Sequence, residues 1–249
     1  MNTIRQDAIR SYIEEKSVAT IKELHALFPE VSLMTIHRDL DALVIQGAIV
    51  KIRGGAKSVR HTGDIGFDIR LRENVAGKLV MVRKALSLIA PHASVFLDAG
   101  TTNLMLARQL PDEDFNIFTT GPNIAIALCR LQKPNITLCC GNLNRKNMAL
   151  SGPNTQQMLE SINLDIAFIG VSGCYAETGF TCGTEADMVI KRSVIRRARK
   201  SVMMCDSTKF SRLMPFTFAS FSDVDYLICD REVPEHIAKA ARDHGVTVL

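Results

Sequence analysis

The sequence contains no tryptophan, and aromatic residues make up only 6% of its 249 residues. A hydrophobic ligand held among aromatic side chains is therefore disfavoured. The seven cysteines are odd in number and form no CxxC pair, so neither a disulfide framework nor a zinc site is indicated. Cys139 and Cys140 lie in an apolar stretch that is typical of a buried strand. We expect reduced cysteines that pack in the core, no metal and no cofactor.

Long hydrophobic runs are also missing. The longest, such as ALSLIA and IAFIGV, are far shorter than the about 20 residues that cross a bilayer as a helix. Arg5, Asp7 and Arg10 leave no apolar signal-peptide core near the first residue, so we expect a cytoplasmic protein with no membrane partner. The net charge of +4 is too small by itself to indicate a polyanionic partner, and the position of the charges matters more.

The first sixty residues have the pattern of three short helices. An apolar stripe at helical spacing predicts the first helix, and the capping box TIKE, with Thr20 at the N-cap and Glu23 three residues later, predicts the start of the second. Ser32 is expected to cap a third helix that runs to Gln46 and ends at Gly47. A tight turn between the second and third helices is typical of a helix-turn-helix.

The third predicted helix has one apolar face and one mixed face. The apolar face consists of Ile36, Leu40, Leu43 and Val44. Arg38 points away from it and is flanked by Met34, His37 and Asp41. A helix that lies in the major groove of DNA presents such a mixture to base edges and phosphates. A small helical subdomain with a solvated polar face would show the same periodicity, so periodicity alone leaves both interpretations open.

A basic hairpin is predicted directly after this helix. Val50 and Ile52 alternate with Lys51 and Arg53, and a Gly-Gly turn follows, which is the pattern of a β-wing. Residues 44–60 contain no acidic residue and four cations, which are Lys51, Arg53, Lys57 and Arg60. A local excess of positive charge is what binding to DNA phosphates requires.

The string VS-x-x-TI-x-RDL-x-x-L, followed by G-x-I-x-x-x-RGGA, resembles the DNA-binding signature of the DeoR family of bacterial transcriptional regulators. The matching residues are Val31, Ser32, Thr35, Ile36, Arg38, Asp39, Leu40, Leu43, Gly47, Ile49, Arg53, Gly54, Gly55 and Ala56. The resemblance implies that double-stranded operator DNA is a partner. It places Ser32, Thr35 and Arg38 on phosphates.

The positions that vary within this signature are then the base readers, and they are Leu33, Met34 and His37. With Lys51 and Arg53 of the wing, they complete the predicted DNA-binding set. His37 stands where the family usually carries a second arginine, which indicates a different operator preference.

The rest of the chain predicts a linker and a larger domain. Residues 58–72 contain glycines and polar residues and are expected to join a DNA-binding domain, residues 1–57, to an effector domain, residues 73–249. An apolar helical stripe follows, formed by Val75, Leu79, Val82, Leu86 and Ile89, and it could pack on the core or on a second subunit. Apolar strands then alternate with amphipathic helices, which predicts a mostly parallel sheet covered on both faces. The predicted fold class is α/β, with an N-terminal winged helix-turn-helix and a Rossmann-like effector domain.

Small and polar residues follow several predicted strands, at the edge where ligands bind in such sheets. The candidates are Asp98, Gly100, Thr101, Thr102, Thr119, Thr120, Gly121, Gly141, Gly170 and Lys209. Taken singly, each loop is as well explained by the capping of the next helix. Taken together, helix N-termini, hydroxyls and one lysine are what a phosphate monoester requires.

The resemblance to the DeoR family continues through this domain. It rests on D-x-G-T-T at residues 98–102, on D-x-A-F-x-G at residues 165–170, on Glu185 and Lys191, and on D-S-T-K-F at residues 206–210. The family's effector domain is similar to ribose-5-phosphate isomerase and senses a phosphorylated sugar or related metabolite, which implies that Glu185 and Lys191 also bind the effector. The chain departs from the family pattern at residues 120–122 and at residues 141–142.

The sequence therefore predicts a repressor of a carbohydrate-metabolism operon that acts as a homo-oligomer, either a dimer or a tetramer. An enzyme is the first alternative: a sugar-phosphate isomerase fused to a DNA-binding module, with Asp98, Glu185 or Asp206 as the base. A constitutive architectural DNA binder is the second, although it would have no use for a polar rim.

Overall fold

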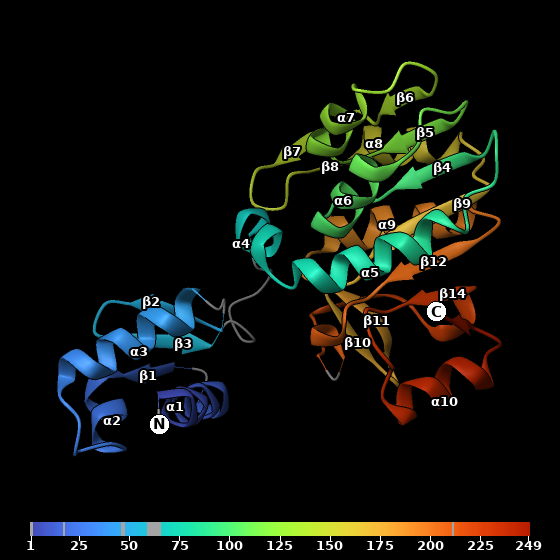
Figure 1. Cartoon of the computed structure of the whole chain (residues 1–249). Coiled ribbons are helices and arrows are strands. Elements are labelled where there is room, and N and C mark those ends of the chain that lie inside the picture. The colour runs from blue at the N-terminus through green and yellow to red at the C-terminus, as the bar shows by residue number, and fades with distance from the viewer. Residues whose placement is uncertain (1, 17, 46–47, 59–65, 211) are drawn as a thin grey trace. The chain divides into compact units, whose positions relative to one another are not determined.

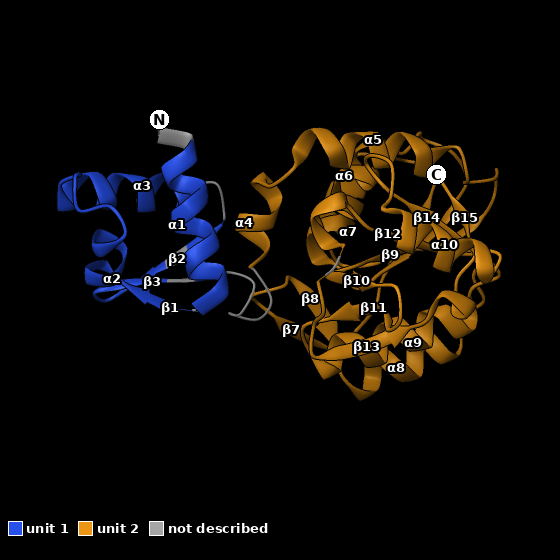
Figure 2. Cartoon of the chain, turned by 90° about the horizontal axis from the view of Figure 1, so that it is seen from below, with its two compact units in different colours: residues 1–65 blue, residues 66–249 orange. Residues whose placement is uncertain are grey.

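The computed structural model describes the chain except residues 1, 17, 46–47, 59–65 and 211. It divides into two compact units, residues 1–65 and residues 66–249 (Figure 2). The expected linker, residues 58–72, differs from this division at its C-terminal end, because helix α4 (Phe67–Arg72) belongs to the second unit. Phe67 is the reason, since its buried side chain packs in the hydrophobic core of that unit.

The N-terminal unit combines three helices with a small antiparallel sheet. The helices are α1 (Asn2–Lys16), α2 (Ile21–Ala26) and α3 (Leu33–Ile45), and the strands are β1 (Val18–Thr20), β2 (Ile49–Ile52) and β3 (Gly55–Ser58). The hairpin β2–β3 is the predicted wing, and β1 adds a strand to β3 that the sequence pattern did not indicate. Apolar residues from all three helices form the core.

The predicted helix starts are present in this unit. Glu23 N donates to Thr20 Oγ1 at 3.2 Å and Thr20 N donates to Glu23 Oε2 at 2.7 Å, which is the capping box that begins α2. At the start of α3, Thr35 N donates to Ser32 Oγ at 3.2 Å. The predicted helix end at residues 46–47 lies outside the described residues.

The buried face of α3 differs from the predicted one at its edges. Ile36, Leu40 and Leu43 are buried as expected, but Val44 is 39% exposed. Asp39 is buried in its place, because α1 packs on that side of the stripe and supplies partners: Arg5 Nε at 2.6 Å and Gln6 Nε2 at 3.0 Å from the carboxylate. The α3 face is thus centred between Ile36 and Leu43 rather than toward Val44.

In the second unit, seven of the described strands form one parallel sheet in the order β15-β14-β12-β9-β4-β5-β6 (Figure 1). Their bounds are β4 (Ser94–Leu97), β5 (Asn116–Thr119), β6 (Asn135–Leu138), β9 (Ile166–Gly170), β12 (Ser201–Met204), β14 (Tyr226–Ile228) and β15 (Thr247–Val248). Every neighbouring pair in this sheet is parallel. The predicted α/β fold with its mostly parallel sheet is therefore confirmed.

Helices cover both faces of the sheet, as its continuous apolar strands require. One face carries α5 (Val75–Leu86), α6 (Thr101–Gln109) and α7 (Pro122–Leu128); the other carries α8 (Pro153–Glu160), α9 (Glu185–Arg197) and α10 (Glu235–Asp243). Smaller elements complete the unit: the hairpin β7 (Asn142–Asn144) and β8 (Ala149–Ser151), the sheet β10 (Gly173–Tyr175), β11 (Gly179–Cys182) and β13 (Phe216–Ala219), and the 3₁₀ turns η2 (Ser207–Lys209) and η3 (Phe221–Asp223). Within the described residues, no helix has the length and apolarity to cross a membrane.

Helix α5 packs on its own sheet, which answers a question that the sequence left open. Met81, Val82 and Ala85 are buried in the core, whereas Val75 and Leu79 are 41% and 37% exposed. The buried face of α5 therefore differs from the predicted apolar stripe in its first turns. Val75 and Leu79 face solvent there, and Lys78 is buried instead.

Candidate functional site

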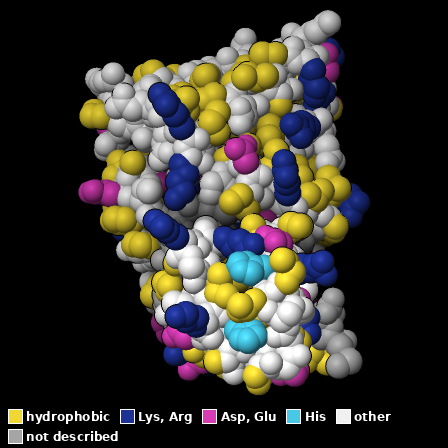
Figure 3. Space-filling model, turned by 90° about the vertical axis from the view of Figure 1, so that its left-hand side faces the viewer, with side chains coloured by type: hydrophobic (Ala, Val, Ile, Leu, Met, Phe, Trp, Pro, Cys, Tyr) yellow, Lys and Arg dark blue, Asp and Glu magenta, His cyan; other side chains and the backbone are white. Residues whose placement is uncertain are grey.

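The start of α3 exposes the residues predicted to bind DNA. Leu33 and Met34 are 51% and 63% exposed, Ser32 and Arg38 are also exposed, and Thr35 and His37 are half-buried. Figure 3 shows hydrophobic side chains beside histidine and basic side chains on one face of the molecule. Leu33 and Met34 are adjacent and lie at the same end of the helix as Ser32, so these three exposed residues of the predicted set are grouped at the start of α3.

Ser32 and Thr35 also have a structural task. Their hydroxyls hydrogen-bond each other at 3.0 Å, and Ser32 Oγ accepts from Thr35 N. A hydroxyl has two acceptor sites and one donor hydrogen, so these bonds leave capacity for a phosphate oxygen. The two residues set the position of the helix end that carries Leu33 and Met34.

The wing lies beside α3 and is tied to it. Lys51 of β2 forms an ion pair with Asp41 of α3, so this predicted phosphate contact already has a partner within the unit. Arg53, at the turn between β2 and β3, is exposed. Gly54 has φ +83°, a conformation that favours glycine, and so permits the tight turn that presents Arg53.

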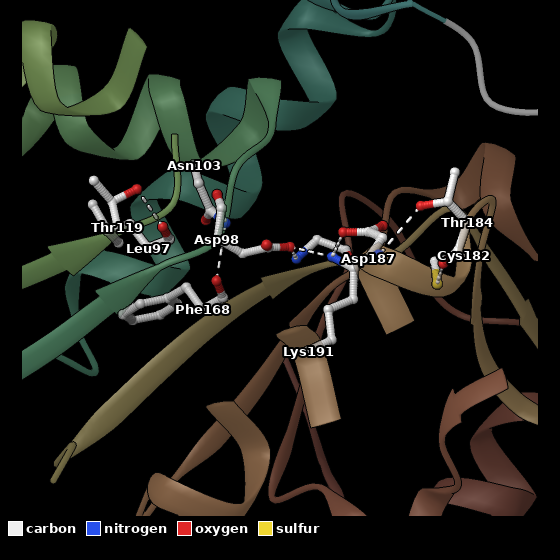
Figure 4. Close-up of polar contacts among 10 residues, drawn as sticks. Leu97, Asp98, Asn103, Thr119, Phe168, Cys182, Thr184, Asp187 and Lys191 are labelled. Carbon is white, nitrogen blue, oxygen red and sulfur yellow. Dashed lines mark hydrogen bonds and ion pairs between the residues drawn. The ribbon is translucent and has the colours of Figure 1, made fainter. Parts of the chain in front are cut away.

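The carboxyl ends of the sheet strands form the predicted rim in the second unit, with a buried ion pair at its centre (Figure 4). Lys191 Nζ of α9 contacts Asp98 Oδ2 after β4, donates to Gly170 O at 2.9 Å and lies 3.6 Å from Asp187 Oδ1. Gly170 N donates to Asp98 Oδ2 at 2.9 Å. Although burial alone would lower it, the carboxylates of Asp187 and Asp98 raise the pKa of Lys191 above its ordinary value.

This ion pair brings two predicted effector residues together, but it turns them toward each other. Asp98 and Lys191 are 1% and 4% exposed. Buried charges persist when they are paired and hydrogen-bonded, and here each satisfies the other. The pair therefore links the loop after β4 to helix α9.

The threonines that follow β4 and β5 are buried as well. Thr119 Oγ1 donates to Leu97 O at 2.6 Å and accepts from Gly121 N at 3.0 Å, while Thr101 and Thr120 are 4% and 1% exposed. Thr119 therefore links the end of β5 to the end of β4 and to the loop before α7, and its hydroxyl is engaged within the protein. Gly100 is buried and Thr102 is half-buried at the start of α6.

Asn103 is a rim residue that the sequence did not single out. Its Nδ2 donates to Asp98 O and to Phe168 O, both at 2.9 Å, and so ties the ends of β4 and β9 together (Figure 4). An amide at the third position of a helix that follows a strand is the signal that could have indicated it.

The remaining predicted effector residues are spread along the rim. Lys209 Nζ lies 3.7 Å from Asp206 Oδ2, and the same carboxylate accepts from Thr208 N at 3.0 Å. Glu185 is exposed in the first turn of α9, and Gly141, with φ +141°, is exposed beside Thr155. A Cβ at Gly141 would lie 2.0 Å from Thr155 Oγ1, so glycine is required by a close approach there.

A small pocket, called the sensor pocket below, lies among the β7–β8 hairpin, the first turns of α9 and the loop after β5. It is lined by Thr120, Asn144, Asn147, Ala149, Leu150, Ser151, Thr184, Ala186, Asp187 and Ile190. Thr120 was predicted from the sequence, whereas Asn147, Thr184 and Asp187 were not. Thr184 Oγ1 caps α9 by accepting from Asp187 N at 3.2 Å. The cap signature T-E-A-D was the available signal for the α9 end of this pocket.

A polar network also fixes the junction between α4 and α5. Asn74 Nδ2 donates to Asp230 Oδ2 at 3.1 Å, and Ser207 N donates to Asp230 Oδ1 at 2.6 Å. Burial opposes ionisation, but the hydrogen bonds from Asn74 and Ser207 prevail and hold the pKa of Asp230 at about 2. Lys78 Nζ donates to Glu73 O at 2.6 Å, and burial lowers the pKa of Lys78 to about 8.

Two family models match the chain, one in each of its two compact units. Residues 73–231 match the family model described as DeoR C terminal sensor domain, and residues 5–62 match the DeoR-like helix-turn-helix domain. The HTH-type transcriptional regulator GlpR of Haloferax volcanii is 31% identical over 220 residues, which cover 88% of this chain and 86% of that protein. The chain belongs to the DeoR family of helix-turn-helix transcriptional regulators.

A second relative and a solved structure are similar to this chain over different lengths. A protein of Haemophilus influenzae named L-fucose operon activator is 26% identical over 248 residues, covering 98% of this chain and 99% of its own. Among solved structures, ribose 5-phosphate isomerase A of Methanocaldococcus jannaschii is similar with a TM-score of 0.42 and 17% identity, over 56% of each chain. The family assignment identifies α3 and the wing as the DeoR helix-turn-helix and the rim as part of the DeoR sensor domain.

Proposed function

We propose that this DeoR-family regulator is a cytoplasmic repressor of a carbohydrate-metabolism operon, and that a phosphorylated sugar or related metabolite controls its affinity for operator DNA. The observation that carries the proposal is the exposed start of α3, where Leu33, Met34 and Arg38 face solvent. Exposed apolar side chains can contact base edges in the major groove, and a neighbouring cation can bind the DNA phosphates.

The effector half of the proposal rests on the sensor unit. Its pocket combines hydroxyl, amide and carboxylate side chains with Ala149, Leu150, Ala186 and Ile190, and the polar groups can hydrogen-bond a polar metabolite. The similar protein from Haemophilus influenzae is named for a sugar operon. Because that protein is named an activator, the sign of the response is a separate question for the experiment below.

A ligand can switch such a protein by binding one arrangement of it more tightly than another. For a repressor released by its effector, the metabolite must favour the arrangement with the lower DNA affinity. We further propose that the chain acts as a homo-oligomer, because helix-turn-helix proteins commonly read two half-sites with two copies.

Replacing Arg38 with alanine should weaken binding to every duplex by a similar factor, roughly tenfold, since one charge-assisted phosphate contact is lost. The salt dependence of binding should fall by about one counterion. Replacing Met34 or His37 should instead change which operator is preferred. The measurement is a competition assay at fixed salt with duplexes selected by the wild-type protein.

Arg199 supplies the matched control, because its side chain is 85% exposed in the sensor unit. Arg199→Ala removes the same charge and should leave both affinity and operator ranking unchanged. If Arg38→Ala altered the ranking while Met34→Ala and His37→Ala left it intact, the assignment of phosphate and base contacts would be reversed.

A specific effector should raise the melting temperature of the protein by mass action. We expect this from a thermal-shift screen with phosphorylated sugars, followed by DNA binding in the presence of the best compound. Lower DNA affinity identifies release from the operator, and higher affinity identifies activation of binding. An equal stabilisation of the Lys209→Ala variant would remove Lys209 from the effector site.

An isomerase fused to a DNA-binding unit is the competing function. The family assignment favours a regulator, and two of the carboxylates nominated as bases are engaged: Asp98 by Lys191, and Asp206 by Thr208 and Lys209. Turnover of any sugar phosphate above background by the purified chain would establish the enzyme instead.

A further inference from the structure

Asn147 lines the sensor pocket with a side-chain oxygen that has no hydrogen-bond partner among the described residues; Asn103 Oδ1, which is not part of the pocket lining, is the other asparagine oxygen of this kind. Asn147 lies between β7 and β8 and is 7% exposed. Its Oδ1 is buried and accepts no hydrogen bond from the part of the chain that the structure describes. A buried carbonyl oxygen without a donor is costly and is uncommon in folded proteins.

The surrounding turn holds Asn147 in this position. Asn144 Oδ1 accepts from Lys146 N at 3.0 Å and from Asn147 N at 3.4 Å, so the backbone of the turn is fixed by its own side chain. The next residue, Met148, has φ +53°, a conformation that non-glycine residues rarely adopt. The turn therefore presents the Asn147 amide at the pocket lining, although none of the described residues donates a hydrogen bond to its oxygen.

The first turn of α9 limits what the pocket can bind. Asp187 lines the pocket with a carboxylate that only accepts hydrogen bonds and that already pairs with Lys191 at 3.6 Å. An anionic group in the pocket would meet acceptor oxygens at Asp187 and at Asn147 Oδ1. A neutral group that donates hydrogen bonds, such as a sugar hydroxyl, is complementary to both oxygens.

We propose that Asn147 is a specificity-determining residue of the sensor pocket and that it recognises a hydroxyl group of a polyhydroxylated effector. The hydroxyl donates to Asn147 Oδ1 or to Asp187. Thr120 and Ser151 line the same pocket. This inference rests on the proposed function, in which the pocket binds the effector. It assigns the hydroxyl-bearing part of that effector to this pocket, and its phosphate to another part of the rim.

The first measurement is the melting temperature without any ligand. Asn147→Ala removes a buried oxygen that has no partner, so the unliganded variant should melt at or above the wild-type temperature. Asn135→Ala, an exposed asparagine of β6 that makes one contact of 3.4 Å with Asn116, is the matched control. A clear fall in melting temperature for Asn147→Ala alone would show a structural role and would overturn the inference.

The second measurement is ligand affinity. The probes are ribose 5-phosphate, glucose 6-phosphate, fructose 1-phosphate and glycerol 3-phosphate, their unphosphorylated counterparts, and inorganic phosphate. For any sugar phosphate that binds the wild type, Asn147→Ala should weaken binding by about tenfold or more, because a site built for a hydroxyl loses its acceptor. Binding of inorganic phosphate should be unchanged, and Asn135→Ala should match the wild type.

The outcomes separate this inference from the proposed function. Sugar-phosphate affinity within twofold of the wild type in Asn147→Ala would overturn the role of Asn147 while leaving the effector class intact. Binding of unphosphorylated sugars that depends on Asn147 would support the inference and contradict the phosphate requirement. If no probe of either kind stabilised the wild type, both the effector class and the role of Asn147 would be rejected.

Discussion

Replacing Lys191 with methionine should lower the free energy of unfolding by about 3–5 kcal/mol, the cost of leaving one member of a buried ion pair uncompensated. Asp98, 1% exposed, would keep only the 2.9 Å hydrogen bond from Gly170 N among the contacts described here. Its charge would then lie in the protein interior without a cation. Urea denaturation monitored by circular dichroism measures the loss.

The double variant Lys191→Met/Asp98→Asn tests whether the loss of stability is electrostatic. Removing both charges eliminates the unpaired carboxylate, so most of the lost stability should return. Arg242→Met is the matched surface control, since its side chain is 66% exposed and pairs with Glu235 at 2.9 Å, and exposed pairs contribute little. A double variant no more stable than Lys191→Met would contradict the electrostatic explanation.

Raising the pH from 9.5 to 10.5 should destabilise the protein by about 4 kcal/mol. Burial raises the pKa of Cys139 to about 11 and that of Cys182 and Cys229 to about 12, and it raises the pKa of Cys205 well above its ordinary value. In the unfolded chain these thiols ionise near pH 9, so the unfolded state loses protons first and stability falls as the pH rises. Each thiol contributes about 1.4 kcal/mol per pH unit in this window.

Lys78 acts in the opposite direction. Its folded pKa of about 8 lies below the ordinary 10.5, so the unfolded state holds more protons between these values and stability rises with pH by about 1.4 kcal/mol per unit. The net loss is therefore that of four thiols less one lysine.

Denaturant melts in the presence of a phosphine reductant measure this alkaline slope. The variant Cys139→Ala/Cys182→Ala/Cys205→Ala/Cys229→Ala should show a nearly flat profile, whereas Cys129→Ala, at an exposed cysteine, should keep the wild-type slope. A wild-type slope in the quadruple variant would assign the alkaline lability to other groups.

Much of the sheet was predictable because each of its strands is a short apolar run that ends at small polar residues. Strands β4 and β5, with the sequences SVFL and NIFT, are followed by Asp98 and by Thr120. The β7–β8 hairpin and the β10–β11–β13 sheet were not predicted. Some of their strands, such as NLN and GCY, contain too few apolar residues to be distinguished from loops.

The N-terminal unit shows the same limit at single residues. Periodicity predicts which side of α3 is apolar, but it cannot show that Arg5 and Gln6 of α1 satisfy Asp39 and allow that carboxylate to be buried. The exposed position of Val44 follows from the same packing. A polar residue on a buried face requires a partner, and the partner is 33 or 34 residues away.

The sequence by itself determined the family, the winged helix-turn-helix and the parallel α/β sheet, since caps, turns and hydrophobic periodicity act over a few neighbouring residues. Only the tertiary structure decided that Asp98 and Lys191, 93 residues apart, neutralise each other, and that Asn147 Oδ1 lies in a pocket lining with no donor among the described residues. Electrostatic and hydrogen-bond partners are chosen by proximity in space, and that proximity exists only once the chain has folded.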